Sequence, residues 1–146
     1  MTDPFDLERF VTAQNPLYSQ VLSELRRGVK TGHWMWFIFP QLKGLGSSWA
    51  ANHFGISSAE EAHAYLQHPI LGERLIECTT ILNQLADRSA LEIFGEIDSL
   101  KLRSSMTLFA EVEQNNEIFK ETLEKYFSGE LDPMTRDKLQ APSRPG

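Results

Sequence analysis

Apolar residues recur every three or four positions along most of this chain, and no other sequence feature constrains the fold as strongly. That spacing places side chains on one face of an α-helix. It is clearest in the segment after Pro69, where the apolar positions are Ile70, Leu71, Leu75, Cys78, Ile81, Leu82 and Leu85. Strand-like sequence is confined to WMWFIF, which is too short and too isolated to make a sheet. The chain is therefore predicted to be an all-α protein.

Residues that start and stop helices divide the chain into segments. Ser58, with Glu61 three positions later, predicts a capped helix start, and Gly28 is a natural helix end. Asp98 and Asp132 are predicted to cap the helices that follow them, because a short carboxylate can accept from free backbone N–H groups.

The length of 146 residues is that of one ordinary domain. We expect about seven helices, some of them short, in a single compact orthogonal bundle. This domain is predicted over residues 2–139, with a disordered tail over residues 140–146.

Composition and charge exclude several classes of protein. A net charge of −6 argues against a broad surface for duplex nucleic acid, which needs clustered positive charge. No apolar run approaches a membrane span, and the acidic N-terminus lacks the features of a secretory signal, so a cytoplasmic location is expected. Cys78 is the only cysteine and the four histidines lack metal-ligand spacing, so neither a metal nor another cofactor is predicted.

The stretch GHWMWFIFPQLKGLGSS combines aromatic residues with a glycine–serine loop. Such a loop, leading into a helix, offers backbone N–H groups to an anion, and aromatic faces can stack a base or sugar. The plainer interpretation is that the aromatics are core and the glycines only turn the chain. Candidate ligand residues in this stretch are His33, Trp34, Gln41, Lys43, Gly46, Ser47 and Ser48.

The two tryptophans of this stretch are expected to differ in role. Gly32 and Pro40 leave room only for an extended segment or a single helical turn. Because six large residues in succession cannot all face one core, we expect one tryptophan to be core and the other to line a cleft. Trp36 is assigned to the core, and Trp34, beside His33, to the cleft.

A second polar block, KLRSSMT, lies in a predicted helix. Lys101, Ser104 and Ser105 fall on adjacent turns, and paired serines are unfavourable inside a helix unless they meet a close neighbour or a ligand. Close helix packing and a polar pocket both remain open as explanations. We predict that this block meets the aromatic stretch around one cleft with His33 and Gln41, because buried polar groups need partners.

Four blocks of the sequence are distinctive: DPFDLERFVTAQ, ELRRGVKTGHWMWFIFPQLKGLGSS, EEAHAYLQHPILGERL and IFGEIDSLKLRSSMTLF. They resemble the family catalogued as domain of unknown function 1810, over nearly the whole chain. The resemblance implies a small, all-helical protein of bacterial type and supplies no activity.

A looser similarity links the later part of the chain to NADAR proteins, which hydrolyse N-glycosidic bonds in ADP-ribosyl compounds or riboflavin precursors. The Glu–His pair of that group is not matched cleanly by Glu60, Glu61 and His63, so no catalytic residue is assigned. If the chain is an enzyme, this analogy implies a hydrolase of the N-glycosidic type.

Two classes of function remain open from the sequence. In the first, the chain binds or hydrolyses a small anionic nucleotide-like or ADP-ribose-like ligand in a polar and aromatic cleft. In the second, it is a non-catalytic helical interaction module whose exposed aromatic residues dock a partner protein. A concave, lysine-lined site favours the first class, whereas a flat apolar patch favours the second.

Overall fold

The structure, a computed structural model, describes residues 3–140, so most of the tail predicted over residues 140–146 lies outside the described residues. Within residues 3–140 the chain forms nine α-helices and no strand. They are α1 (Glu8–Gln14), α2 (Tyr18–Arg27), α3 (Met35–Ile38), α4 (Trp49–His53), α5 (Ala59–Gln67), α6 (Leu71–Gln84), α7 (Ala90–Val112), α8 (Glu117–Phe127) and α9 (Pro133–Gln140).

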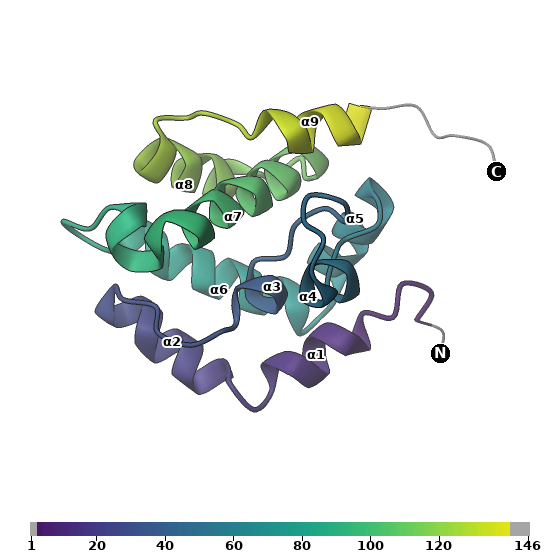
Figure 1. The fold of residues 1–146 in the computed structure, drawn as a ribbon, viewed down its shortest axis with the longest axis horizontal. Helices are drawn as coiled ribbons and strands as arrows, with labels where there is room; N and C mark the ends of the chain where they lie inside the picture. Colours follow the sequence, from purple (N-terminus) through teal and green to yellow (C-terminus); the bar gives the residue numbers. More distant parts are fainter. Residues whose placement is uncertain (1–2, 141–146) are drawn as a thin grey trace.

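Helices α6, α7 and α8 form the centre of the molecule (Figure 1). Helix α8 packs on both α6 and α7, and α5 closes one end by contacting α6 and α7. Helices α1 and α2 lie along one side of this centre, while α9 crosses the opposite side against α7. The short helix α3, which carries the aromatic stretch, sits between α1 and the centre, so its side chains are surrounded by apolar partners.

The all-α prediction is confirmed, although the described residues contain more helices than the seven or so expected. The shortest helices are α3, in the aromatic stretch, with 4 residues, and α4, the helix expected after the glycine–serine loop, with 5. Helices this short do not produce a repeating apolar pattern, because they make scarcely more than one turn.

Several predicted helix boundaries are confirmed by their hydrogen bonds. The Glu61 N–H donates to Ser58 Oγ at 3.1 Å, and the Thr135 N–H donates to Asp132 Oδ2 at 3.0 Å. Gly28 ends α2 in the left-handed conformation, with φ 74°, which costs glycine no steric strain. These start and stop signals depend only on neighbouring residues and were therefore readable from the sequence.

The prediction that Asp98 caps a helix is wrong. Helix α7 begins earlier, with a capping box in which Ser89 and Glu92 exchange hydrogen bonds, and it is interrupted only at Gly95, where φ is 79° and ψ is 175°. Asp98 lies inside α7, and its carboxylate is ion-paired with Lys30 and Lys101. The Asp98 carboxylate thus pairs with Lys30, far away in the sequence, and with Lys101, three residues on, rather than with backbone N–H groups.

None of the helices within residues 3–140 is both long and apolar enough to cross a membrane. The described residues also contain no group of three or more histidine, cysteine or acidic side chains placed to hold a metal ion. Cys78 is fully buried, and that burial raises the pKa of its thiol to about 12. Its thiolate is therefore scarce at neutral pH, and the residue acts as a small apolar side chain of α6.

Candidate functional site

The aromatic stretch folds into the single turn of α3, which turns most of its side chains into the core. Trp34 and Phe39 are fully buried, and Met35, Phe37 and Ile38 are at most 9% exposed. Trp36 is half-buried and is the exception. The sequence assignment is therefore reversed: Trp34 is core, and Trp36 is the tryptophan that reaches the surface.

Trp34 is held by a buried carboxylate. Its Nε1 donates to Glu24 Oε1 at 3.0 Å, and the same oxygen accepts the backbone N–H groups of Thr31 at 2.7 Å and Gly32 at 2.9 Å. The amide of Gln20 donates to the other oxygen at 2.7 Å. The Trp34 ring is thus buried and its nitrogen is hydrogen-bonded to Glu24, so this side chain cannot stack on a ligand.

The hydrogen bonds around Glu24 also fix its charge. Burial raises the pKa of Glu24, but the donors from Gly32, Thr31, Gln20 and Trp34 outweigh burial and lower the pKa to about 2. The carboxylate is 1% exposed and ionised at neutral pH. It is a structural anion that ties the end of α2 to the loop before α3.

Two lysines, one aspartate and Trp36 meet on the other side of this loop. We call Lys30, Trp36, Asp98 and Lys101 the lysine–tryptophan cluster. Lys30 Nζ lies 2.8 Å from one carboxylate oxygen of Asp98, and Lys101 Nζ lies 3.2 Å from the other. Lys101 Nζ also lies 4.0 Å from the centre of the Trp36 ring, a cation–π distance. The two sequence blocks therefore meet through Lys101 and Trp36, while the common cleft with His33 and Gln41 stays a prediction.

The charges of the cluster do not balance. Partial burial raises the pKa of Asp98, but the hydrogen bonds and charges of Lys30 and Lys101 outweigh it and leave the pKa below its ordinary value. One ionised carboxylate thus faces two ammonium groups. The side chain of Lys101 is 21% exposed and that of Lys30 is 7% exposed, so Lys101 is the more accessible cation.

The glycine–serine loop borders the cluster at one point. A Cβ at Gly46 would lie 3.6 Å from the Trp36 ring and 3.1 Å from Ala51, so the bare backbone of the loop passes close to the ring. Ser48 Oγ accepts the N–H of Ala51 at 3.1 Å and caps α4, as a plain cap residue does. Ser47 is exposed nearby.

The remaining candidate residues separate from the cluster. Lys43 is exposed and lines a polar cavity of about 400 Å³ together with Arg9, Asn52 and His53. His33 is exposed, whereas Gln41 is 8% exposed and packed inward. The structure thus brings Lys101, Trp36 and Gly46 together. Lys43, His33 and Gln41 are not part of the lysine–tryptophan cluster.

The two candidate serines of α7 are Ser104 and Ser105. Ser104 Oγ lies 3.2 Å from both the Leu100 carbonyl and Asp132 Oδ2, so it helps to attach the start of α9 to α7. Ser105 is fully buried, and its hydroxyl has no hydrogen-bond partner among the described residues. Close packing of α7 therefore explains Ser104, and nothing in the structure explains the unpaired hydroxyl of Ser105.

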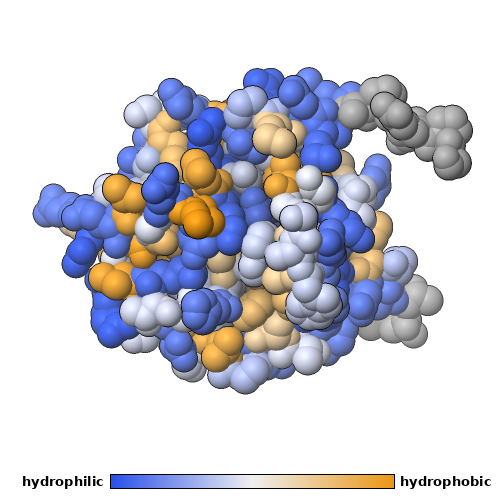
Figure 2. All heavy atoms as spheres, in the orientation of Figure 1, coloured by the Kyte–Doolittle hydropathy of each residue, from blue (hydrophilic) through white to orange (hydrophobic). Residues whose placement is uncertain are grey.

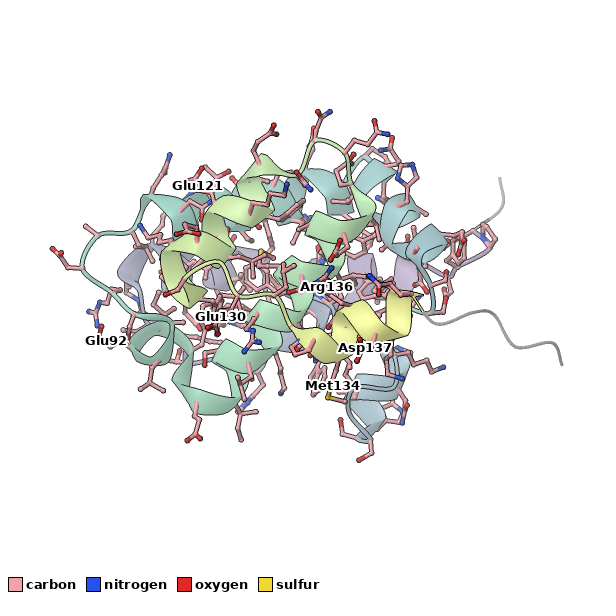
Figure 3. The ribbon with its side chains drawn as sticks, turned by 90° about the horizontal axis from the view of Figure 1, so that it is seen from above. Glu92, Glu121, Glu130, Met134, Arg136 and Asp137 are labelled. Carbon is pink, nitrogen blue, oxygen red and sulfur yellow. The ribbon has the colours of Figure 1, made fainter. Side chains whose placement is uncertain are left out.

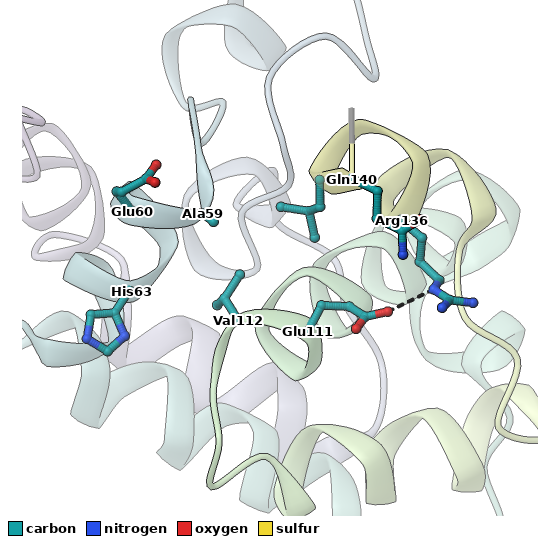
Figure 4. A pocket seen from close by; sticks show the side chains of 8 residues that line it. Ala59, Glu60, His63, Glu111, Val112, Arg136 and Gln140 are labelled. Carbon is teal, nitrogen blue, oxygen red and sulfur yellow. Dashed lines mark ion pairs between the residues drawn. The ribbon is translucent and has the colours of Figure 1, made fainter. Parts of the chain in front are cut away.

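Sequence reasoning missed a pocket between α5, α7 and α9. It has a volume of about 540 Å³ and contains Glu60 and His63 on one wall and the Glu111–Arg136 ion pair, 2.8 Å long, on the other (Figure 4). Figure 3 shows Arg136 and Met134 pointing to opposite sides of α9, with Arg136 toward the end of α7. The sequence held no signal for this pocket, because its walls come from three helices far apart in the chain.

Comparisons with known proteins place the chain among relatives without an assigned activity. A family model described as protein of unknown function (DUF1810) matches residues 4–139. The crystal structure of the conserved hypothetical protein Rv1873 from Mycobacterium tuberculosis is similar, with 58% sequence identity and a TM-score of 0.94. The match covers 96% of this chain and 100% of that one. No curated protein matches the chain.

Proposed function

The chain belongs to the DUF1810 family, whose description names no activity, and we propose that it binds a small anionic ligand of the nucleotide or ADP-ribose kind. The ligand would place a phosphate against Lys101 and a base or sugar against Trp36. The observation that carries the proposal is the position of Lys101 Nζ, 4.0 Å from the Trp36 ring centre and beside a carboxylate that it shares with Lys30.

Charge supports an anion at this place. The chain has a net charge of −6, so a general attraction of phosphate to its surface is not expected. Locally, two ammonium groups share one carboxylate, and a phosphate can take the place of Asp98 as a partner for Lys101 without leaving Lys30 unpaired. A charge-assisted hydrogen bond of this kind is stronger than one between neutral groups.

The surroundings of Trp36 support a ring or sugar. Trp36 is half-buried, so the rest of the α3 turn holds its indole in place. The backbone at Gly46 runs beside the ring without a side chain to cover it. An indole fixed by the core and bordered by bare backbone is a suitable stacking surface for a planar group.

A thermal-shift titration with ADP-ribose, AMP and ribose 5-phosphate tests the proposal, because a ligand that binds the native state raises the unfolding midpoint. We expect ADP-ribose or AMP to raise the midpoint and Lys101→Ala to abolish the rise while the unliganded protein stays folded. Lys120→Ala is the matched control, since Lys120 is exposed on α8 and the charge change is the same. Equal shifts in wild type and Lys101→Ala would remove the cluster as the site.

Fluorescence gives a second readout at Trp36. The most exposed tryptophan is Trp49, at 73%, so the measurement should use Trp49→Phe protein. In that background, Trp34 is buried, and we expect the ligand to change the emission of Trp36 and to protect it from iodide.

Nucleotides and ADP-ribosyl compounds contain N-glycosidic bonds, so hydrolysis of such a bond is a further activity to test. Chromatography of ADP-ribosyl compounds and nucleosides incubated with the protein would detect a released base or amine. Binding without turnover would leave the proposal as a ligand-binding function.

The alternative is a helical interaction module that docks a partner through the aromatic stretch. Among the tryptophan and phenylalanine side chains of that stretch, only Trp36 is partly exposed, so they offer little area for such a contact. Exposed apolar side chains gather instead over the first half of α7 (Figure 2), where Leu91, Ile97 and Leu100 are 61%, 71% and 56% exposed. An interaction function would therefore use α7 rather than the aromatic residues.

A further inference from the structure

One face of α6 and of the turn before it is left uncovered by the other helices. Pro69, Gly72, Glu73, Ile76 and Glu77 recur at three- and four-residue spacing, which places them on a single side of the helix. All five line a groove with a volume of about 620 Å³. Ile76 is 41% exposed, although an amphipathic helix would normally bury an isoleucine at such a position.

The floor of this groove is apolar, with Leu66 and Phe119 among its lining residues. A Cβ at Gly72 would come within 2.2 Å of the Leu66 carbonyl oxygen. Only a residue without a side chain allows this approach, so the end of α5 packs directly on α6 at Gly72. The floor could receive apolar side chains from a partner.

The rims of the groove are acidic on both sides. Glu73 and Glu77 stand one helical turn apart on α6, and Glu113 comes from a different element, the turn that joins α7 to α8. None of these three carboxylates belongs to an ion pair formed within residues 3–140. Three negative charges thus flank an apolar stripe.

The lining offers these carboxylates no lysine or arginine. Its one histidine, His68, accepts the backbone N–H groups of Ile70 and Leu71 through Nδ1, at 3.1 and 3.2 Å. Positive charge that complements the rims can therefore come from a partner.

We propose that this groove binds a basic amphipathic helix from a partner protein. Its apolar stripe would lie on Leu66 and Ile76, with lysines or arginines on both flanks paired to the rim carboxylates. Recognition of a helix in an apolar groove is a recurring mode of binding, and opposite charges on the rims add specificity and association rate. A linear polyamine fits less well, because its charges lie along its own axis over the apolar floor, whereas the carboxylates stand on either side.

The probe for this proposal is a fluorescein-labelled model helix made of leucine on one face and lysine on the other, followed by anisotropy. We expect the wild-type chain to bind it, with weaker binding at higher salt because the rims are exposed. The triple variant Glu73→Gln, Glu77→Gln and Glu113→Gln should weaken binding at least tenfold. Ile76→Ser alone should weaken it several-fold, since the isoleucine contacts the leucine face.

The matched control is a triple variant with the same change of charge at carboxylates that do not line the groove. Glu8, Glu121 and Glu124 are exposed and belong to no ion pair within residues 3–140, so changing all three to Gln should leave binding within about twofold. Circular dichroism of every variant verifies that the helices are intact. Equal weakening by both triple variants would show nonspecific attraction and overturn the proposal, as would an absence of binding.

Competition between the labelled helix and spermidine tests whether the groove binds an amphipathic helix or any polycation. Spermidine should displace the probe only by general screening, with similar effect on the two triple variants. If spermidine binds the wild type tightly, loses that binding in the rim variant and is indifferent to Ile76→Ser, the groove is a polycation site and the helix proposal fails.

Discussion

Trp34 and Trp36 stand two residues apart in one turn of helix and lie in opposite environments. Trp34 is fully buried, with its nitrogen bonded to the ionised carboxylate of Glu24. Trp36 is half-buried, with the ammonium of Lys101 over its ring. Tryptophan is therefore a core residue at position 34 and part of a candidate binding surface at position 36.

The cause of this difference is helical geometry combined with the charges nearby. Residues two apart in a helix point about 200° away from each other, so when one side chain faces the core the other faces outward. Glu24 accepts from the indole N–H of Trp34, whereas the ammonium of Lys101 lies over the π-face of Trp36. A short segment can thus support both the fold and a surface site.

The largest expected effect is the difference between removing the two indoles. Trp34→Ala should lower the free energy of unfolding by about 3–5 kcal/mol, because it leaves a cavity in the core. Trp36→Ala should cost clearly less, since part of its ring is already in water. Urea unfolding of both variants measures the difference, and equal losses would mean that Trp36 is as much a core residue as Trp34.

Removing the anion that holds Trp34 should have the next largest effect. Glu24→Ala leaves the Trp34 indole N–H and two backbone N–H groups without their acceptor, and we expect a loss of about 2–4 kcal/mol in unfolding free energy. Glu24→Gln should cost less, because its amide oxygen can still accept. A larger loss for Gln than for Ala would contradict the hydrogen-bond account.

Acid should remove the same contribution without a mutation. The pKa of Glu24 falls from 4.5 to about 2 on folding, so its stabilisation is complete above pH 4.5 and is lost as the pH falls toward 2. The stability advantage of wild type over Glu24→Gln should therefore shrink across this window. Urea unfolding midpoints of the two proteins at pH 6 and pH 3 provide the measurement; an advantage that grows in acid has the wrong sign for this mechanism.

The smallest effect is expected on the Trp36 side. Lys101→Ala removes a partly exposed ion pair and a cation–π contact, and should lower the free energy of unfolding by about 1 kcal/mol or less. Chemical denaturation can resolve this from the Glu24 variants. A loss as large as that of Glu24→Ala would mean that Lys101 is a structural residue and would weaken its proposed role in binding.

Local signals in the sequence were sufficient for the helices but not for the site. The stop at Gly28, the cap at Ser58 and the start of α9 after Asp132 depend on residues within a turn of each other, and all three are confirmed. Lys101 was singled out correctly as a neighbour of the aromatic stretch, because a lysine among small polar residues in an apolar helix needs a partner. Asp98 was misassigned because a cap residue and an ion-pair residue look alike in sequence.

The sequence by itself determined that this chain is helical, where most helices begin and end, and that its aromatic stretch could not lie wholly in the core. Only the tertiary structure decided which tryptophan faces inward. Helical periodicity fixes the angle between Trp34 and Trp36 but not the rotation of their turn about its own axis. Tertiary contacts fix that rotation: Glu24 of α2 accepts from the Trp34 indole, and Lys101 of α7 lies over the Trp36 ring. Lys101 is 65 positions from Trp36, and no sequence pattern predicts the contact.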